Sequence, residues 1–453
     1  MSDTRETRNE YDEYYDRPPV RRKRRKKTPW EKFKEAYLPL VLVVVGLIAV
    51  IMVIVGIVKL ASGSGKDKGN TLPSGTEDTS ETGDPNLNQP SAEAREILNR
   101  AAELAGHYDY DGAIALLSAY AGEDTQVAAA IQQYTADKQT LVLWEDPTEV
   151  PHISFQPLIV DTARAFDGDS QSDYYDRNNL TVEEFRAVLE QLYGNGYVLI
   201  SMSDVASPNA EGKYVGGSIY LPQGKSPLIM SLVPAHYPVS RAGDGFARRL
   251  VVDETGKISC EYIDSTSTRV SGAYDFVTIL EAFIGEHPDF SYHGARAILG
   301  FSGDDEPLGY DITDAAEAAS AKAVAQCLRD TGYEFASFTY DEIRYGDATD
   351  GEVTADVQKW EDTLEPILGQ VQILIYPGGS ELESYEGAKF DALYNAGFRY
   401  FCGMDNYSTC WGKITDQYVR QDRRTINGTR ITEDADLIDD LFDANKVVSS
   451  ERP

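Results

Sequence analysis

The sequence predicts an α/β protein with parallel strands, preceded by a transmembrane helix and a small helical hairpin. An uncharged apolar run spans residues 38–58, and apolar residues recur at helical spacing over residues 91–140. From Trp144 onward, short β-rich runs alternate with helical patterns. Such alternation implies parallel strands with helices outside them, as a barrel or an open doubly wound sheet. About 300 residues suit one barrel domain.

The apolar run Leu38–Val58 is long enough to cross a membrane. It holds twenty-one residues without a charge, which as a helix reach roughly 31 Å. Seven Lys and Arg residues precede it at positions 21–27, and basic flanks stay on the cytoplasmic side. We therefore expect a single-pass plasma-membrane protein with a cytoplasmic N-terminus and an extracellular bulk. A cleaved signal peptide is the alternative, but its apolar core is shorter, roughly 7–15 residues.

These features divide the chain into five parts. Residues 1–36 hold few aliphatic side chains and predict a disordered cytoplasmic tail. The membrane helix occupies residues 37–60. Residues 61–90 are rich in Gly, Ser, Thr, Asp and Pro, which predicts a flexible linker. A helical hairpin or collar follows at residues 91–143, and the α/β domain at residues 144–453.

The charge distribution restricts the partners. The net charge is −32, and residues 1–36 carry twelve Lys/Arg against eight Asp/Glu, so the remainder carries −36. An acidic body of this kind repels polyanions, which argues against nucleic acid as a partner. Four cysteines are too few for a disulfide-built fold. Whether Cys402 and Cys410 pair is left open by the sequence.

Helix signals are clear over residues 91–140. Ser91 is placed to cap a helix that stops at Gly106, a second helix begins near Asp111, and a third follows Asp124. The stretch 108–117 resembles half of a tetratricopeptide-type hairpin, although about three repeats are needed for a solenoid. We expect a collar on the next domain. The alternative is a scaffold that recruits a partner through this hairpin.

Strands and helices then alternate along the α/β domain. A capping box at Thr181-Val-Glu-Glu184 opens one helix, with Gly194 and Gly196 at its end. The other helices are expected at residues 276–284, 315–328, 357–364 and 390–396. Strands are expected at residues 153–160, 197–201, 228–232, 297–301, 335–339, 371–376 and 398–402, with a hairpin of 248–252 and 257–262.

An ordered set of segments carries a family resemblance. The set comprises 152–160, Ala165-Phe-Asp-Gly-Asp169, 181–201, Pro227-Leu-Ile-Met-Ser231, Gly243-Asp-Gly-Phe-Ala247, 274–290, Phe335-Ala-Ser337, Tyr376-Pro-Gly-Gly379 and 397–402. Residues 144–445 thereby resemble the polysaccharide deacetylases of the NodB-homology type. The resemblance implies a distorted (β/α) barrel and hydrolysis of acetyl groups on N-acetylated sugars. In that chemistry a divalent cation, usually zinc, activates the attacking water.

The residues that the resemblance implies for catalysis are absent. The general base and the metal-binding Asp would fall at Val233 and Pro234, and the two metal-binding His at Phe338 and Glu342. None of Val, Pro and Phe can bind a cation or take up a proton. We therefore expect no catalytic residue, no metal and no other cofactor, and a degenerate module that binds an envelope glycan or an envelope protein.

The same resemblance places groove candidates at strand ends above the barrel. They are His236, Tyr237, Asp244, Tyr340 and Tyr376. The alternative to a binding module is an active N-acetyl sugar deacetylase with a non-standard metal site, for which His236, Asp244 and Glu342 would supply ligands. Ligand type and spacing are wrong for zinc, which disfavours this alternative. Metal content of the purified protein distinguishes the two.

Overall fold

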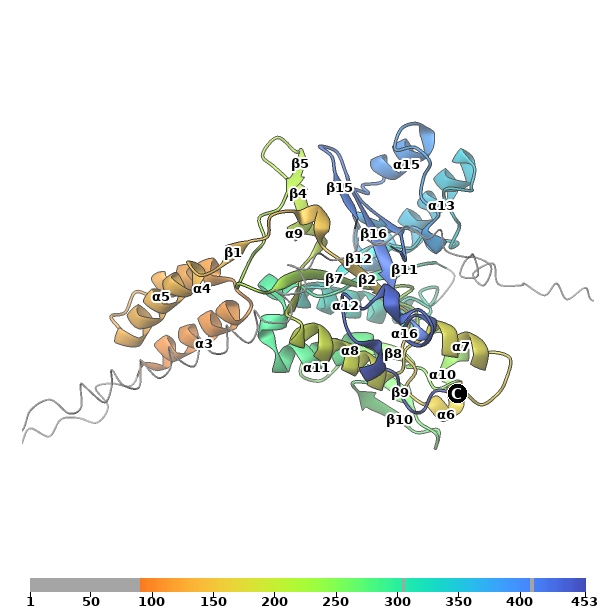
Figure 1. Ribbon diagram of the computed structural model, residues 1–453, viewed down its shortest axis with the longest axis horizontal. Helices are drawn as coiled ribbons and strands as arrows, with labels where there is room; N and C mark the ends of the chain where they lie inside the picture. The colour runs from red at the N-terminus through yellow and green to blue at the C-terminus, as the bar shows by residue number, and fades with distance from the viewer. Residues whose placement is uncertain (1–89, 304–305, 408–410) are drawn as a thin grey trace, which may run out of the picture. The chain divides into compact units, whose positions relative to one another are not determined.

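Seven parallel strands close into a barrel in the computed structural model of this protein (Figure 1). In order around the circle they are β2 (His152–Phe155), β7 (Ser226–Leu232), β11 (Ile298–Phe301), β12 (Glu334–Ser337), β13 (Ile373–Ile375), β14 (Tyr400–Met404) and β16 (Val419–Thr425). The pairing of β11 with β7 closes the circle. The expected parallel α/β architecture is thus confirmed, and of the two arrangements considered it is the barrel.

The structure describes residues 90–453 except 304–305 and 408–410. Residues Pro90–Pro453 form one compact unit. Within this part of the chain no helix is long and apolar enough to cross a membrane. The run 38–58, the cytoplasmic tail and the linker lie outside the described residues, so their assignments stay predictions.

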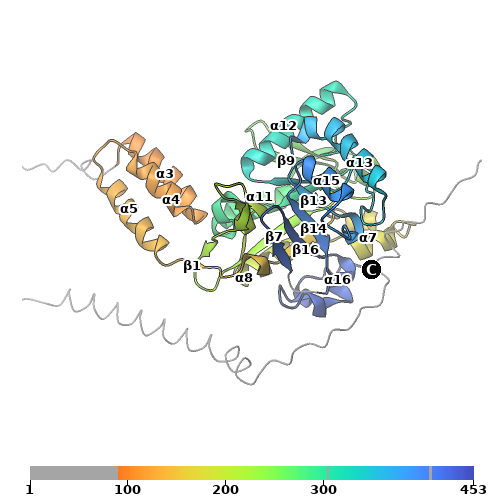
Figure 2. The same ribbon diagram turned by 90° about the horizontal axis from the view of Figure 1, so that it is seen from above.

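Helices cover the outside of the barrel (Figure 2). The larger ones are α8 (Val182–Gly194), α11 (Phe276–Glu286), α12 (Ala315–Thr331), α13 (Asp350–Thr363) and α15 (Ala388–Asn395), and the short helix α14 (Glu365–Leu368) follows α13. The capping box predicted at Thr181 is confirmed, because its hydroxyl accepts from Glu184 N and Glu184 accepts from Thr181 N. Phe155, Phe185 and Phe276 pack with ring centroids 4.7–5.6 Å apart and join β2 to α8 and α11.

The strand that completes the barrel was not predicted. No strand was expected beyond residue 402, yet β16 lies between β14 and β2. Its sequence, VRQDRRT, has four charged residues in seven and lacks the apolar alternation of a half-buried strand. Residues 419–425 nevertheless form a strand, because the inward-facing side chains of β16 contact polar rather than apolar side chains in the lumen.

Two further differences concern strand lengths and pairings. The strand expected at 153–160 ends at Phe155, and Ile159 makes only isolated bridges to Thr181 and Phe246. The expected hairpin forms as β8 (Arg249–Val252) and β9 (Ile258–Ile263), and β10 (Arg269–Gly272) adds a third antiparallel strand.

The remaining short elements connect or flank the barrel. They are β1 (Val142–Leu143), β3 (Tyr197–Leu199), β4 (Ala206–Pro208), β5 (Tyr214–Gly216), β6 (Tyr220–Leu221), β15 (Gly412–Ile414), α6 (Thr162–Ala165), α7 (Ser172–Asn178), α9 (Met202–Val205), α10 (Val239–Ala242) and α16 (Gly428–Thr432). Of these, β3 pairs in parallel with β7, and β15 pairs antiparallel with β16.

Three helices precede the barrel: α3 (Ala92–Gly106), α4 (Tyr110–Ser118) and α5 (Thr125–Lys138). The predicted caps Ser91 and Asp124 both accept backbone hydrogen bonds at helix starts. The helices share a small core of their own. They contact the barrel domain through His107 Nδ1 and Ser291 O, 3.1 Å apart, and through the Tyr108 hydroxyl, which donates to Asp289 O at 2.9 Å.

Candidate functional site

A polar network fills the barrel lumen. His152 of β2 contacts Gln421 of β16 through Nδ1 (3.1 Å) and Ser231 of β7 through Nε2 (3.0 Å). Arg423 of β16 donates to Ser154 Oγ at 3.0 Å and to Gly403 O at 3.1 Å. The network joins the first, second and last strands of the circle. The barrel lumen is therefore filled by side chains, so a ligand site is expected at the carboxyl ends of the strands rather than inside the barrel.

Burial controls the charge states in the lumen. Arg423 is 1 % exposed and is the largest fully buried side chain among the described residues. Burial, followed by the nearby Arg423 charge, holds the pKa of His152 well below its usual value. His152 is therefore a neutral imidazole. It acts as a hydrogen-bonding support below the mouth rather than as an acid or base.

The mouth of the barrel is apolar where the resemblance implies a metal centre. Val233 follows β7 and is 6 % exposed, and Phe338 follows β12 and is 4 % exposed. A Cβ added to Gly300 of β11 would lie 3.2 Å from a Val233 methyl and 3.4 Å from Ile375 Cδ1. Val233 and Ile375 thus fill the space beside Gly300 at this end of the barrel.

Glu342 is the one carboxylate among the four positions that the resemblance assigns to catalysis. Its Oε1 accepts from Ser302 Oγ, the first residue after β11, at 2.9 Å. One carboxylate beside Val233, Pro234 and Phe338 does not fit a zinc site. Over the described ranges, no three His, Cys, Asp or Glu side chains are grouped to hold a metal ion. We derive no hydrolytic step through a cation.

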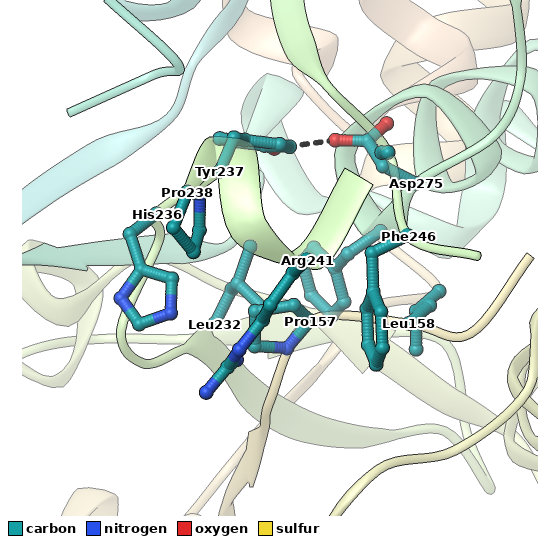
Figure 3. A pocket seen from close by; sticks show the side chains of 11 residues that line it. Pro157, Leu158, Leu232, His236, Tyr237, Pro238, Arg241, Phe246 and Asp275 are labelled. Carbon is teal, nitrogen blue, oxygen red and sulfur yellow. Dashed lines mark hydrogen bonds between the residues drawn. The ribbon is translucent and has the colours of Figure 1, made fainter. Parts of the chain in front are cut away.

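A hollow lies beside the mouth, against the segments that follow β2 and β7 (Figure 3). Its walls include Pro157, Leu232 and Phe246, together with the side chains of His236 and Arg241. Both ring nitrogens of His236 are buried. The enclosed part is about 10 Å³, roughly one water molecule. A larger ligand would lie over this hollow rather than inside it.

The groove candidates have different surroundings. His236 lines the hollow. Tyr340 lies at the mouth, where its ring is within 2.4 Å of the position that a Gly303 Cβ would take. Asp244 accepts from the Tyr175 hydroxyl at 2.7 Å, which together with burial raises the pKa of Tyr175. These contacts place Asp244 in a side cluster with α7.

Two of the predicted groove tyrosines are buried, although Tyr237 also lines the hollow. Tyr376 is 0 % exposed and packs among Tyr345 and Phe401 outside the barrel. The Tyr237 hydroxyl donates to Asp275 Oδ2 at 2.5 Å, as the dashed line in Figure 3 shows. Asp275 caps α11 by accepting from Thr278 N. The physical reason is strand parity: a residue just past a strand end faces the helices as readily as the mouth.

Sequence reasoning missed Arg241, Gln421 and Arg423. Arg241 stands two residues before the quoted Gly243-Asp-Gly segment, and this proximity was the available signal. Nothing local marks Gln421 or Arg423 as lumen residues, since their partners lie on β2 and β14.

No protein-family model and no curated protein matches the sequence. Among solved structures, the chain is similar to the Streptococcus pyogenes deacetylase PplD in complex with acetate. The TM-score is 0.34 and the identity 12 %, over 64 % of this chain and 94 % of that chain. At this level the similarity carries no argument about residues or activity.

Proposed function

We propose that this protein is a membrane-anchored, cell-surface, polysaccharide deacetylase-like protein that binds an envelope glycan without hydrolysing it. The observation that supports it best is the hollow beside the barrel mouth. Pro157 is partly exposed and offers apolar surface to the C–H face of a sugar, and the partly exposed Arg241 offers its guanidinium to the hydroxyl or acetamido oxygens.

The apolar mouth supports binding without hydrolysis. Val233 and Phe338 occupy the positions where the resemblance implies a base and a metal ligand, and both are buried. The net charge of −32 favours a neutral N-acetylated glycan over an anionic wall polymer. Zinc or another divalent metal belongs to this site only under the alternative of a non-standard deacetylase.

Calorimetry on the full-length protein in nanodiscs tests this, with N-acetylglucosamine oligomers as the probe. We expect saturable binding that Arg241→Ala weakens about tenfold, equal to about 1.4 kcal/mol. Lys257→Ala, an exposed change in the β8–β9 turn, is the control and should leave binding unchanged. Absence of binding would refute glycan recognition at the hollow. Release of acetate, or one retained metal ion per chain, would support the hydrolytic alternative.

The helical region supports a second candidate, an envelope scaffold. Helices α3–α5 have their own core, formed by Ala94, Ala101, Ala113, Leu117 and Val127. A co-purification partner that depends on residues 91–143 but not on Arg241 would favour the scaffold over the glycan-binding role.

A further inference from the structure

Two carboxyl groups meet on the outer face of the barrel, away from the mouth and the hollow. Asp422 of β16 is the register partner of Gly403 in β14. Glu381 belongs to the loop between β13 and α15. A Cβ added to Gly403 would lie 2.1 Å from Glu381 Oε1 and 2.5 Å from Asp422 Oδ1. The missing side chain of Gly403 thus leaves room for these two oxygens to lie close together.

Among the described residues, the hydrogen-bond donors around the pair all donate to the same oxygen, Glu381 Oε2. Arg420 Nε and Nη2 donate to Glu381 Oε2 at 3.1 and 2.5 Å, and the Tyr385 hydroxyl donates to the same oxygen at 3.0 Å. Asp422 Oδ1 is buried, and no donor among the described residues reaches it. Two carboxylate oxygens in one space, one of them buried, are unfavourable unless a proton lies between them.

We propose that Glu381 and Asp422 share one proton, and that this acid–carboxylate pair is a pH-sensitive latch between the β13–α15 loop and β16. In the closed state the Asp422 O–H donates to the Glu381 carboxylate. Release of that proton to solvent leaves two carboxylates side by side, of which Arg420 neutralises one. The latch then opens by charge repulsion.

The groups around the pair favour a shared proton that dissociates near neutral pH. Burial, then the Glu381 charge, raises the pKa of Asp422 to about 7. Asp405 raises it further and Arg420 opposes this. The other titratable or charged groups near the pair are Tyr376, Tyr385, Cys402 and Arg423. Burial keeps the pKa values of Tyr376, Tyr385 and Cys402 above their usual range, so these groups stay neutral while Asp422 titrates.

The latch has a direct path to the surface. Asp422 N donates to Trp411 O at 3.1 Å, beside β15. The Arg420 guanidinium lies 4.9 Å from the Trp411 ring centroid, and Trp411 is 36 % exposed. Separation of Asp422 from Glu381 therefore changes the surroundings of an exposed indole.

Fluorescence of the full-length protein between pH 5 and 9 tests the latch. The Trp411 signal is taken as the difference between wild type and Trp411→Phe. We expect one transition with a midpoint near pH 7. Asp422→Asn should abolish it and keep the closed spectrum, because the amide donates to Glu381 permanently. Gly403→Ala should give the open spectrum at every pH, since its Cβ would force the oxygens apart.

Asp416→Asn in the β15–β16 turn is the matched control and should leave the midpoint unchanged. If Asp422→Asn does not fold, Glu381→Gln serves as the second variant, because its amide can donate to Asp422. A wild type without a transition, or an Asp422→Asn or Glu381→Gln protein that keeps the same midpoint, would overturn the proposal. Glycan binding through Arg241 is measured separately, so the two proposals can fail independently.

Discussion

Arg452 and Glu184 form a bidentate ion pair that connects two segments far apart in the sequence. Arg452 Nε donates to Glu184 Oε1 at 2.6 Å, and Nη2 donates to Oε2 at 2.8 Å. Both side chains are almost fully buried, at 4 % and 0 % exposure. Glu184 is also the capping-box residue of α8. The Glu184 carboxylate thus stabilises the start of α8 and also holds the C-terminal segment that carries Arg452.

Replacement of Arg452 should strongly destabilise the folded protein. Arg452→Ala leaves Glu184 buried without its partner and also frees Asp176, which Arg452 Nη1 contacts at 2.7 Å. We expect the free energy of unfolding to fall by about 3–5 kcal/mol. Urea denaturation of the variant measures this change.

Lys446→Ala is the matched control for that experiment. Its ion pair with Asp443 is exposed, at 70 % and 45 % of the side chains, and is expected to contribute less than about 1 kcal/mol. Equal losses in the two variants would contradict a special role for Arg452.

The packing at the barrel mouth predicts an overpacking effect. Gly300→Ala places a Cβ 3.2 Å from Val233 Cγ2 in a filled site, and should destabilise the protein by about 1–3 kcal/mol. Adding Val233→Ala removes the obstructing methyl groups, so the double variant should lose less than the sum of the two single losses. A double-mutant cycle by denaturation measures this coupling.

Gly285→Ala on α11 distinguishes packing from a general effect of replacing glycine. Nothing lies within 4 Å of the added Cβ there, and Ala is a better helix former than Gly by about 1 kcal/mol. The control should therefore be neutral or stabilising. Additive single losses at positions 233 and 300 would show that the mouth is looser than the structure indicates.

His152 predicts a loss of stability in acid. Its pKa is lowered by burial in the folded state, so between the folded and unfolded pKa values the unfolded chain binds more protons. The contribution of neutral His152 to the free energy of unfolding is complete above pH 6.5, the ordinary pKa of histidine in an unfolded chain. This contribution is lost as the pH falls below 6.5. The difference in unfolding free energy between pH 8 and pH 5 should shrink in His152→Gln. Parallel pH profiles in the two proteins would show that His152 titrates normally.

Glu334 predicts the opposite dependence. Burial raises its pKa from 4.5 to about 7, although its carboxylate accepts from Met202 N at 2.7 Å. A carboxyl group with a raised folded pKa stabilises the protein at low pH, and this contribution is lost as pH rises through about 7. Glu334→Gln removes the titration, so the stability of the variant relative to wild type should increase from pH 5 to pH 8. A constant difference across this range would contradict the raised pKa.

Local signals predicted most of the elements correctly. Ser91, Asp124 and Thr181 were expected to cap helices and do so, because a cap depends on residues within one turn. Strand β16 was missed because its polar inner residues are stabilised by His152 and Ser154, which lie about 270 positions earlier in the chain. Tyr376 directly follows β13 and Tyr237 lies beyond the end of β7, and the direction of each side chain depends on the elements that pack around it.

The sequence by itself determined the α/β class, the helix starts and the presence of Val, Pro, Phe and Glu at positions 233, 234, 338 and 342. These follow from periodicity and residue identity, which are local properties. Only the tertiary structure decided the contact of His152 with Gln421, the ion pair of Glu184 with Arg452 and the closeness of Asp422 to Glu381. Each of these contacts joins parts of the chain that are distant in sequence and that only the folded chain brings together.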